Sequence, residues 1–473
     1  MLPRTIPAFL AAVGAALLVA WFTAAPAGEW RPRGPETSLT PVLGEEPSSP
    51  TESGPSSVPS VPLPGILVKG DAVPAAGLAG SWPSFRGINR DGVSHEEVPL
   101  ARSWPAGGPE VVWSLKVGRG YGGPVVHRGR VYLLDYDVAR KADALRCLSL
   151  ADGNEIYRRW YSNPIKTQHG YSRTSPAVTD KYVVTLGPSC HVMCLDADSG
   201  EYRWGMDLVA RYGATVPEWY AGQCPLIDAG RAIIAPGGAA LMIAVDCDSG
   251  RVLWETPNPR RWKMTHSSIA PMTVDGRKMY VYCASGGVVG VDAATGELLW
   301  EDTSWRIDPV NVSSPVPMEG AKVFLSGGYR AGSLMLELTQ AGGKFTARQM
   351  YRLKHRDFGS EQHTPVLFGG HIYGVDPAGK LACLDPGGKV IWHSGDQQRF
   401  GKGYGPYLIA DGMLFVLGHD GLLVLAEATP AGYRQLARAQ VAGEHSWGPM
   451  AIAGGLLLLR DFDTLLCLDV RAK

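Results

Sequence analysis

A unit of four short strands recurs along most of the chain, and this repeat limits the possible folds more than any other feature. Its clearest copy is residues 270–302, APMTVDGRKMYVYCASGGVVGVDAATGELLWED. Asp275-Gly276, Ser285-Gly286-Gly287 and Ala294-Thr295-Gly296 separate its apolar stretches, as turns separate the strands of antiparallel hairpins. Four strands of this length cannot bury both of their faces alone, so the copies are expected to stack on one another.

The copies are marked by a proline that opens each unit after a small or polar loop. These prolines are Pro124, Pro176, Pro225, Pro271, Pro315, Pro365, Pro406 and Pro449, separated by 52, 49, 46, 44, 50, 41 and 43 residues. The third strand repeats as CLSLADG, CLDADSG, AVDCDSG, GVDAATG and CLDPGG, and an aromatic residue follows four positions after the glycine at Tyr157, Trp204, Trp254, Trp300 and Trp392. The fifth and seventh units lack this aromatic residue. Such a period predicts an all-β, eight-bladed β-propeller of four-stranded antiparallel blades.

The two ends of the repeat array complement each other. The last unit stops at Lys473, one strand short, whereas the segment PEVVWSLKV at 109–117 precedes the first full unit and carries its own Trp113. We therefore expect this N-terminal strand to close the last blade, which leaves the ring without an open edge.

The first 80 residues have a different composition. Residues 1–27 have one early charge at Arg4, an apolar core and an Ala25-Pro26-Ala27 ending, which fits either a cleaved signal peptide or a transmembrane anchor. Residues 28–80 are rich in Pro, Ser, Gly and Glu, as in a disordered linker. The expected domains are thus an export segment, a linker and a propeller over residues 81–473, with the protein in the periplasm or cell envelope and membrane contact only through the N-terminal segment.

The opening of the propeller region, SWPSFRGINRDGVS at 81–94, adds a specific resemblance. Together with blades that end in LD-A-x-TG-x-x-x-W, it resembles the exported propellers built from pyrroloquinoline-quinone (PQQ) repeats of planctomycete-type bacteria. The blades also resemble the quinoprotein alcohol dehydrogenases and the propeller lipoprotein of the outer-membrane assembly machine. The resemblance covers residues 81–473 and implies a fold shared by enzymes and scaffolds.

The resemblance to quinoprotein dehydrogenases implies PQQ between a tryptophan and a disulfide of adjacent cysteines, a calcium ion and an aspartate base. This chain has eight cysteines and no adjacent pair. Cys147, Cys194, Cys383 and Cys467 share one slot of the third strand, which predicts small buried residues on separate blades. We therefore predict no cofactor, with PQQ and calcium as the alternative.

The loops before the opening prolines are expected to converge at one mouth of the central channel. Their polar and aromatic residues form the predicted ligand-binding rim: Tyr121, Arg173, Trp219, Tyr220, His266, Asn311, Glu361, His363, Lys402, Tyr404, His445 and Trp447, with His169 beside them. The four histidines stand at different distances from their prolines, so neither a metal site nor a catalytic residue is predicted. The alternative is that these loops are polar only because they are exposed.

Charge and rim together favour a binding protein. The 45 basic and 45 acidic residues balance, which argues against a nucleic-acid partner or an anionic membrane surface. We expect a monomeric, non-catalytic scaffold of the cell envelope that recognises a protein, peptide or glycan at the channel mouth. The alternative is a PQQ-dependent oxidoreductase, similar to alcohol or sugar dehydrogenases, with a divergent site.

Overall fold

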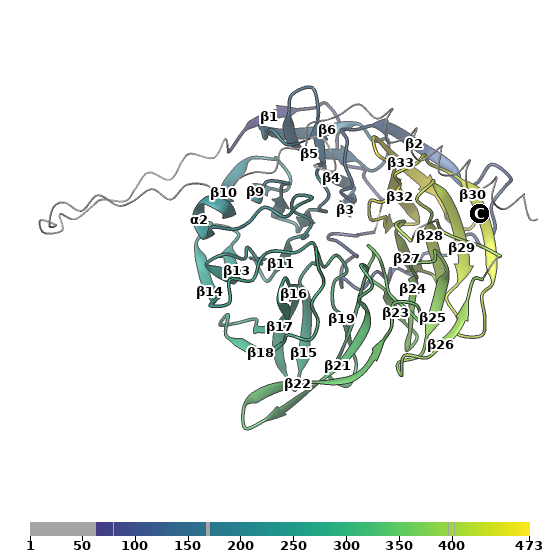
Figure 1. Cartoon of the computed structure of the whole chain (residues 1–473). Helices are drawn as coiled ribbons and strands as arrows, with labels where there is room; N and C mark the ends of the chain where they lie inside the picture. Colours follow the sequence, from purple (N-terminus) through teal and green to yellow (C-terminus); the bar gives the residue numbers. More distant parts are fainter. Residues whose placement is uncertain (1–62, 79, 167–170, 396, 402) are drawn as a thin grey trace, which may run out of the picture. The chain divides into compact units, whose positions relative to one another are not determined.

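The protein is described by a computed structural model that covers residues 63–78, 80–166, 171–395, 397–401 and 403–473 (Figure 1). These residues belong to one compact unit, Ser57–Lys473. The predicted export segment, residues 1–27, lies outside the described residues, as does the linker up to residue 62. Within the part described, no helix is long and apolar enough to cross a membrane.

Eight antiparallel sheets form the eight predicted blades, each with four strands or, in the first blade, five. Blade 1 contains β3 (Val125–His127), β4 (Arg130–Asp137), β5 (Ala142–Ser149), β6 (Glu155–Ser162) and β1 (Ile66–Lys69). Blade 2 contains β7 (Ala177–Val178), β8 (Tyr182–Leu186), β9 (His191–Asp196) and β10 (Tyr202–Asp207), and is followed by the short helix α2 (Leu208–Tyr212). Blade 3 contains β11 (Leu226–Asp228), β12 (Arg231–Ile234), β13 (Ala240–Asp246) and β14 (Val252–Pro257). Blade 4 contains β15 (Ala270–Val274), β16 (Arg277–Ala284), β17 (Gly287–Asp292) and β18 (Leu298–Asp302).

The second half of the chain repeats this order. Blade 5 contains β19 (Val316–Met318), β20 (Lys322–Gly327), β21 (Gly332–Ala341) and β22 (Lys344–Leu353). Blade 6 contains β23 (Val366–Phe368), β24 (His371–Val375), β25 (Leu381–Leu384) and β26 (Val390–His393). Blade 7 contains β27 (Tyr407–Ala410), β28 (Met413–Leu417), β29 (Leu422–Glu427) and β30 (Gln435–Gln440). Blade 8 contains β31 (Ala451–Ala453), β32 (Leu456–Arg460), β33 (Thr464–Asp469) and β2 (Glu110–Lys116). The first strands of neighbouring blades contact one another, as β3 does with β31 and with β7, and Figure 1 shows β27 towards the centre of the ring and β30 at its periphery.

The predicted closure of the ring is confirmed. Strand β2 pairs with β33 in an antiparallel register that places Trp113 opposite Cys467. The outer strands of the fifth and seventh units, β22 and β30, also form. In β22 the aromatic residue is Tyr351, which the spacing in the sequence did not indicate: it lies over Gly388 of blade 6, and its hydroxyl donates to the Pro386 carbonyl.

The repeated glycine and aromatic residue pack against each other between blades. The ring of Trp204 in blade 2 lies over Gly250 of blade 3, and a Cβ atom at Gly250 would come within 2.7 Å of it. The Trp204 indole also donates a hydrogen bond of 2.9 Å to the Cys247 carbonyl. Trp113 has the same relationship to Gly153 and Leu150, across the seam where the ring closes. This packing explains why the two residues recur together in the sequence.

Strand β1 differs from the sequence prediction, which placed it in the disordered linker. Ile66–Lys69 pairs antiparallel with β6 and adds a fifth, outer strand to blade 1. Ile66 and Val68 remain 52% and 42% exposed, whereas Leu67 packs against the core between blades 1 and 2. This strand has only four residues, Ile-Leu-Val-Lys, so a composition averaged over the surrounding Pro- and Ser-rich stretch does not reveal it.

Residues 82–94, here called the plug, lie across the central channel. Trp82 pairs with Val126 of β3, and Val93 pairs with Ile409 of β27. The Pro83 carbonyl accepts a hydrogen bond from Val178 of β7. Because these partners belong to innermost strands of three different blades, the plug spans the space that those strands enclose.

The partly buried Arg86 and the buried Arg90 fasten the plug to further blades. The Arg86 guanidinium donates to the carbonyls of Thr364 and Pro365, at the start of blade 6. Arg90 donates to the carbonyls of Cys224 and Pro225, before blade 3, and of Ile269, before blade 4. Burial lowers the pKa of both guanidinium groups to about 10, so both stay charged at neutral pH. The plug is thus bound by charge-assisted hydrogen bonds to backbone rather than by ion pairs.

Candidate functional site

A cavity of about 370 Å³ lies at the channel mouth formed by the loops that enter the first strands. Its lining consists of Phe85, Tyr121, Arg173, Trp219, Gly222, Cys224, His266, Ser268, Val312, Tyr329, Gln362, His363, Tyr404, Trp447 and Pro449. Phe85 belongs to the plug, whereas the other residues come from loops of different blades. The plug therefore forms one wall of the cavity, and the blade loops form the rest.

Seven of the twelve predicted rim residues line this cavity: Tyr121, Arg173, Trp219, His266, His363, Tyr404 and Trp447. Tyr220, Asn311, Glu361 and His445 do not, and Lys402 and His169 lie outside the described residues. Asn311 is only 2% exposed, and its carbonyl accepts hydrogen bonds from the backbone of His266 and Ser267. Tyr220 likewise contacts a lining residue without lining the cavity: its carbonyl accepts a hydrogen bond of 2.8 Å from Nε2 of His266.

Two stacked aromatic pairs border the cavity. Tyr121 and Trp447 have ring centroids 5.0 Å apart with 16° between their planes, and Tyr404 meets Trp447 edge-on at 5.5 Å. Trp219 and Tyr329 are nearly parallel, 6.3 Å apart with 6° between planes. Rings held in this way present apolar faces to a ligand. Because the side chains are already ordered, binding costs them little further conformational entropy.

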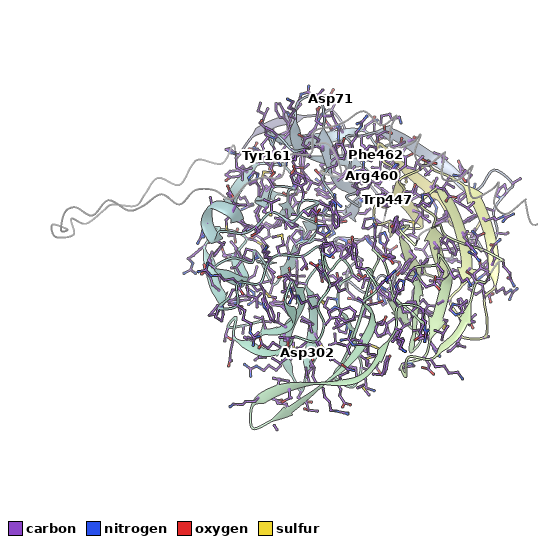
Figure 2. All side chains as sticks on the ribbon, viewed as in Figure 1. Asp71, Tyr161, Asp302, Trp447, Arg460 and Phe462 are labelled. Carbon is purple, nitrogen blue, oxygen red and sulfur yellow. The ribbon has the colours of Figure 1, made fainter. Side chains whose placement is uncertain are left out.

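The Tyr121 and Trp447 pair is supported by blade 8. Phe462, in the turn between β32 and β33, packs on Tyr121 with centroids 5.5 Å apart. Its carbonyl accepts a hydrogen bond of 2.7 Å from the fully buried Arg460. Figure 2 shows Trp447, Arg460 and Phe462 grouped at the inner edge of this blade. The Tyr121–Trp447 pair therefore packs on Phe462, whose backbone is held in place by Arg460.

The two histidines of the cavity are neutral at physiological pH. Burial lowers the pKa of His266 to about 3 and that of His363 to about 4. Their Nε2 atoms lie 2.8 Å from the Tyr220 carbonyl and 3.0 Å from the Tyr404 carbonyl. Because a carbonyl oxygen only accepts, each Nε2 carries the proton that it donates.

Arg173 supplies the positive charge of the cavity. Its guanidinium lies over the Tyr121 ring, 5.6 Å from the centroid, which permits a cation–π interaction. Burial lowers the pKa of Arg173 to about 10, which leaves the group charged at pH 7. Among the described side chains that line the cavity there is no aspartate or glutamate, but burial and the nearby carboxylates of Glu361 and Glu218 raise the pKa of Tyr329 in its wall.

The backbone before Arg173 is fixed by a buried carboxyl group. The Ser172 hydroxyl donates to Asp143, whose other oxygen accepts a hydrogen bond of 3.1 Å from the Tyr161 hydroxyl. The Ser172 carbonyl accepts from the backbone N–H of Tyr121 at 2.8 Å. Burial raises the pKa of Asp143 to about 7. Asp143 therefore holds the loop that carries Arg173 and links it to Tyr121.

Phe85 and Tyr329 are the principal cavity residues that the sequence did not indicate. Phe85 belongs to a motif expected to anchor on the propeller, but the sequence does not show that the segment crosses the channel. Tyr329 lies in the turn between β20 and β21, where its φ of 52° is unusual for a tyrosine. Nothing in the local sequence distinguishes this turn from those of the other blades.

The cysteines do not contribute a disulfide to the site. All eight are free and buried. Cys147, Cys194, Cys383 and Cys467 occupy third strands of four different blades, as predicted. Burial raises the pKa of Cys147, Cys383 and Cys467, so these thiols are inert and serve packing.

The donor groups of the cavity do not fit PQQ with calcium. In the part of the chain that is described, no three His, Cys, Asp or Glu side chains are grouped to hold a metal ion. Calcium prefers several oxygen ligands, carboxylates among them, whereas the described lining offers amide and hydroxyl oxygens, imidazoles and a guanidinium but no carboxylate. Cys224, the cysteine of the lining, is one of the free thiols.

Comparisons with known proteins agree on the fold. The family profile described as outer membrane protein assembly factor BamB matches residues 141–394. No curated protein matches the chain. The structure of BamB from Moraxella catarrhalis superposes with a TM-score of 0.53 at 13% identity, covering 76% of this chain and 99% of its own. The computationally designed Ika8 protein gives 0.52 at 11% identity, with the same coverage of both chains.

A quinohemoprotein alcohol dehydrogenase from Pseudomonas putida HK5 is also similar, at 14% identity over 83% of this chain and 81% of its own. Its TM-score of 0.46 is too low to support a conclusion about this chain. At these identities the structural likenesses concern the fold alone, whereas the profile match spans more than half of the sequence.

Proposed function

The chain belongs to the PQQ-repeat β-propeller family of the outer membrane protein assembly factor BamB, and from this premise we propose that it is a non-catalytic binding protein of the cell envelope. Its partner is a protein, peptide or glycan, recognised at the channel mouth. The N-terminal segment exports the protein and either is cleaved or anchors it. The domain limits are those of the sequence analysis, except that the propeller domain begins near residue 63.

The observation that carries this proposal is the cavity at the channel mouth. Two stacked aromatic pairs, one guanidinium and two neutral imidazoles converge there from loops of different blades. Apolar faces combined with a few oriented polar groups are the usual composition of a binding pocket. Large aromatic and arginine side chains also carry most of the binding energy in protein interfaces.

The same groups favour binding over catalysis. His266 and His363 donate Nε2–H to carbonyl groups, and their pKa values of about 3 and about 4 make them weak bases at neutral pH. A general base works best with a pKa near the operating pH. Because the donor set does not fit PQQ with calcium, we derive no oxidoreductase mechanism.

Site-specific photo-crosslinking in cells that carry the full-length protein tests the binding role. A benzophenone amino acid replaces the exposed Tyr329 at the cavity, and the control replaces Met350 on the outer strand β22, which is 40% exposed. We expect a discrete crosslinked product from position 329 that disappears when Trp447→Ala is added, and no such product from position 350. Equal products from both positions, or a product from 329 that persists with Trp447→Ala, would contradict binding at the cavity.

Titration with PQQ and calcium tests the alternative. A ligand at a hundred times its dissociation constant adds about 2.7 kcal/mol to the free energy of unfolding. We expect an unchanged unfolding transition for a binding protein. A clear rise in the transition temperature, together with quinone absorbance on the purified protein, would support the oxidoreductase instead.

A further inference from the structure

We propose that the channel-mouth cavity binds a neutral saccharide, with the exposed ring of Tyr329 as the platform on which a sugar ring stacks. This inference rests on the proposed binding function and names the class of its ligand. Three features of the cavity lead to it: its apolar lining is mainly aromatic, charges of both signs lie around it, and polar groups of its lining have no partner among the described residues.

The apolar part of the described lining is mainly aromatic. Six of the fifteen lining residues carry a phenyl, phenol or indole ring, whereas the aliphatic side chains are those of Val312 and Pro449. An aromatic ring has a negative face, which attracts the weakly positive C–H groups on the flat face of a sugar ring. An acyl chain or an aliphatic side chain would need no such faces. The composition therefore favours a ligand with flat apolar faces and polar edges.

Tyr329 is the most exposed of these rings. Its side chain is 46% exposed, and its ring lies nearly parallel to that of Trp219, with 6.3 Å between the centroids. Trp219 in turn meets His266 edge-on at 6.4 Å. One face of the Tyr329 ring is therefore turned towards Trp219, and its exposure leaves the other face for a ligand. Because Trp219 already orients the ring, stacking on it costs little conformational entropy.

Charges of both signs lie around the cavity, which favours a neutral ligand. The Arg173 guanidinium already interacts with an aromatic ring of the wall, so the proposal does not depend on it. Burial raises the pKa of Tyr329, and the carboxylates of Glu361 and Glu218 raise it further because they lie nearby. A cationic ligand would be repelled by Arg173, and an anionic ligand would be repelled by the two carboxylates. A neutral saccharide meets neither penalty.

Two polar side chains of the lining have unused hydrogen-bonding groups. The Nε2 atom of the buried His266 donates to the Tyr220 carbonyl, so its Nδ1 atom is an acceptor, and no described residue donates to it. The Gln362 amide has no hydrogen-bond partner within the described chain, and it offers both donors and an acceptor. Each sugar hydroxyl can donate and accept, so a saccharide can satisfy both kinds of group at once.

The plug limits the length of the ligand. Phe85 lines the cavity from the plug, and the plug is paired with innermost strands of two blades, through Trp82 on β3 and Val93 on β27. The volume of about 370 Å³ is near the lower end of the range for ligand pockets, roughly 300–1,000 Å³. A continuous polymer cannot pass through a channel that is closed in this way. The geometry admits a short oligosaccharide, or the end of a longer glycan, from the open mouth.

The first experiment measures saccharide binding by the purified full-length protein. The probes are immobilised short oligosaccharides of neutral hexoses, of N-acetylhexosamines and of uronic acids, and calorimetry then gives the affinity for the one that binds most strongly. We expect binding of neutral oligosaccharides that does not weaken as the salt concentration rises, because no ion pair with the ligand contributes. Binding of uronic acids alone, or of no saccharide, would overturn the inference.

Two variants at position 329 test the platform. Tyr329→Ala removes the ring and is expected to weaken the affinity about tenfold or more, as loss of a central aromatic contact does. Tyr329→Phe keeps the ring face and should lose much less. Thermal unfolding of each variant verifies that it folds. An affinity of Tyr329→Ala equal to that of the wild type would refute the platform role.

A second pair of variants tests the polar edge of the site. Gln362→Ala removes an amide from the lining and is expected to weaken saccharide binding. Gln349→Ala is the matched control, because Gln349 is exposed on the outer strand β22 and does not line the cavity. Equal affinity of both variants would contradict a hydrogen bond from Gln362 to the ligand.

Failure of this inference is distinguishable from failure of the proposed function. A crosslinked product at position 329 that protease digests, in a protein that binds no saccharide, supports a protein or peptide partner and contradicts only the saccharide inference. Saccharide binding that depends on Tyr329, without a crosslinked product in cells, contradicts the scaffold function and supports the saccharide site. Absence of both contradicts both proposals.

Discussion

The indole ring of Trp447 stacks on the phenol ring of Tyr121, with centroids 5.0 Å apart and 16° between the planes, and this contact joins the last blade to the first. Trp447 precedes β31, whereas Tyr121 lies between the closing strand β2 and β3. The Tyr121 backbone N–H also donates to Ser172, at the entrance to blade 2. The contact that joins the last blade to the first therefore also forms one wall of the cavity.

Trp447→Ala is expected to weaken binding of the partner at the cavity by about 2 kcal/mol, or roughly thirtyfold, as truncation of a central aromatic residue does in interfaces. Trp447→Phe should lose much less, because an aromatic face against Tyr121 remains. The yield of crosslinked product from position 329 compares the two variants. Equal losses in the two variants would show that the indole contributes something other than its ring face.

The plug provides a second prediction, on stability. Arg90→Met leaves three buried carbonyls, of Cys224, Pro225 and Ile269, without the guanidinium that bonds to them. An unsatisfied buried polar group costs about 1–3 kcal/mol, so we expect the free energy of unfolding to fall by at least that amount. Urea unfolding followed by tryptophan fluorescence measures the change.

Arg356→Met is the matched control for Arg90. The Arg356 side chain is 77% exposed, so its replacement should change stability by less than about 0.5 kcal/mol. Similar small changes at both positions would mean that the plug is not fastened through Arg90.

The repeat carried enough information to predict the architecture. Blade number and the closing strand followed from the prolines and from Trp113, because one packing unit recurs at five junctions between blades. In it a tryptophan or tyrosine covers the turn glycine of the next blade. The predicted closing segment, 109–117, contains the observed β2, Glu110–Lys116. β30 forms without this aromatic residue because its backbone pairs with β29 along its length.

The site was predictable only in part, since it depends on departures from the repeat. The position of the loops correctly predicted seven residues of the cavity lining. It also predicted Asn311, which is buried and whose carbonyl accepts a hydrogen bond from the His266 backbone N–H. Phe85 arrives from a segment outside the repeat, and Tyr329 from a turn between second and third strands. Which side of a loop a residue faces depends on contacts with other blades, and a single sequence does not show these.

The closing strand yields a third prediction. Trp113 is 8% exposed, donates a hydrogen bond of 2.9 Å to the Leu150 carbonyl and covers Gly153. Trp113→Ala should lower the free energy of unfolding by about 3–5 kcal/mol, the usual cost of removing a buried tryptophan. Chemical unfolding provides the measurement.

Trp392→Ala serves as the comparison for Trp113. Trp392 donates an equivalent hydrogen bond of 2.9 Å to the Thr429 carbonyl but is only half-buried, so its loss should cost clearly less. A cost at Trp392 equal to that at Trp113 would indicate that the hydrogen bond, and not burial at the seam, sets the energy.

Asp143 predicts a specific dependence of stability on pH. Burial raises its pKa to about 7, against an ordinary value of about 3.9. Between these pH values the folded protein keeps a proton that the unfolded chain releases, so the contribution of Asp143 to stability is full below about pH 4 and is lost as the pH rises through about 7. A difference of this size corresponds to about 4 kcal/mol. The neighbouring Asp135 carboxylate adds to the shift.

The measurement is the difference in unfolding free energy between the wild type and Asp143→Asn from pH 4 to pH 8.5. The asparagine retains an oxygen for Ser172 or Tyr161 but does not titrate, so the variant should gain several kcal/mol relative to the wild type as the pH rises. His266 and His363 act in the opposite sense, because their lowered pKa values make stability fall as the pH drops below about 6.5. Their contribution is common to both proteins and cancels in the difference. Parallel pH profiles of the two proteins would show that Asp143 is already ionised in the folded state, and that the loop carrying Arg173 is held by a carboxylate rather than by a protonated acid.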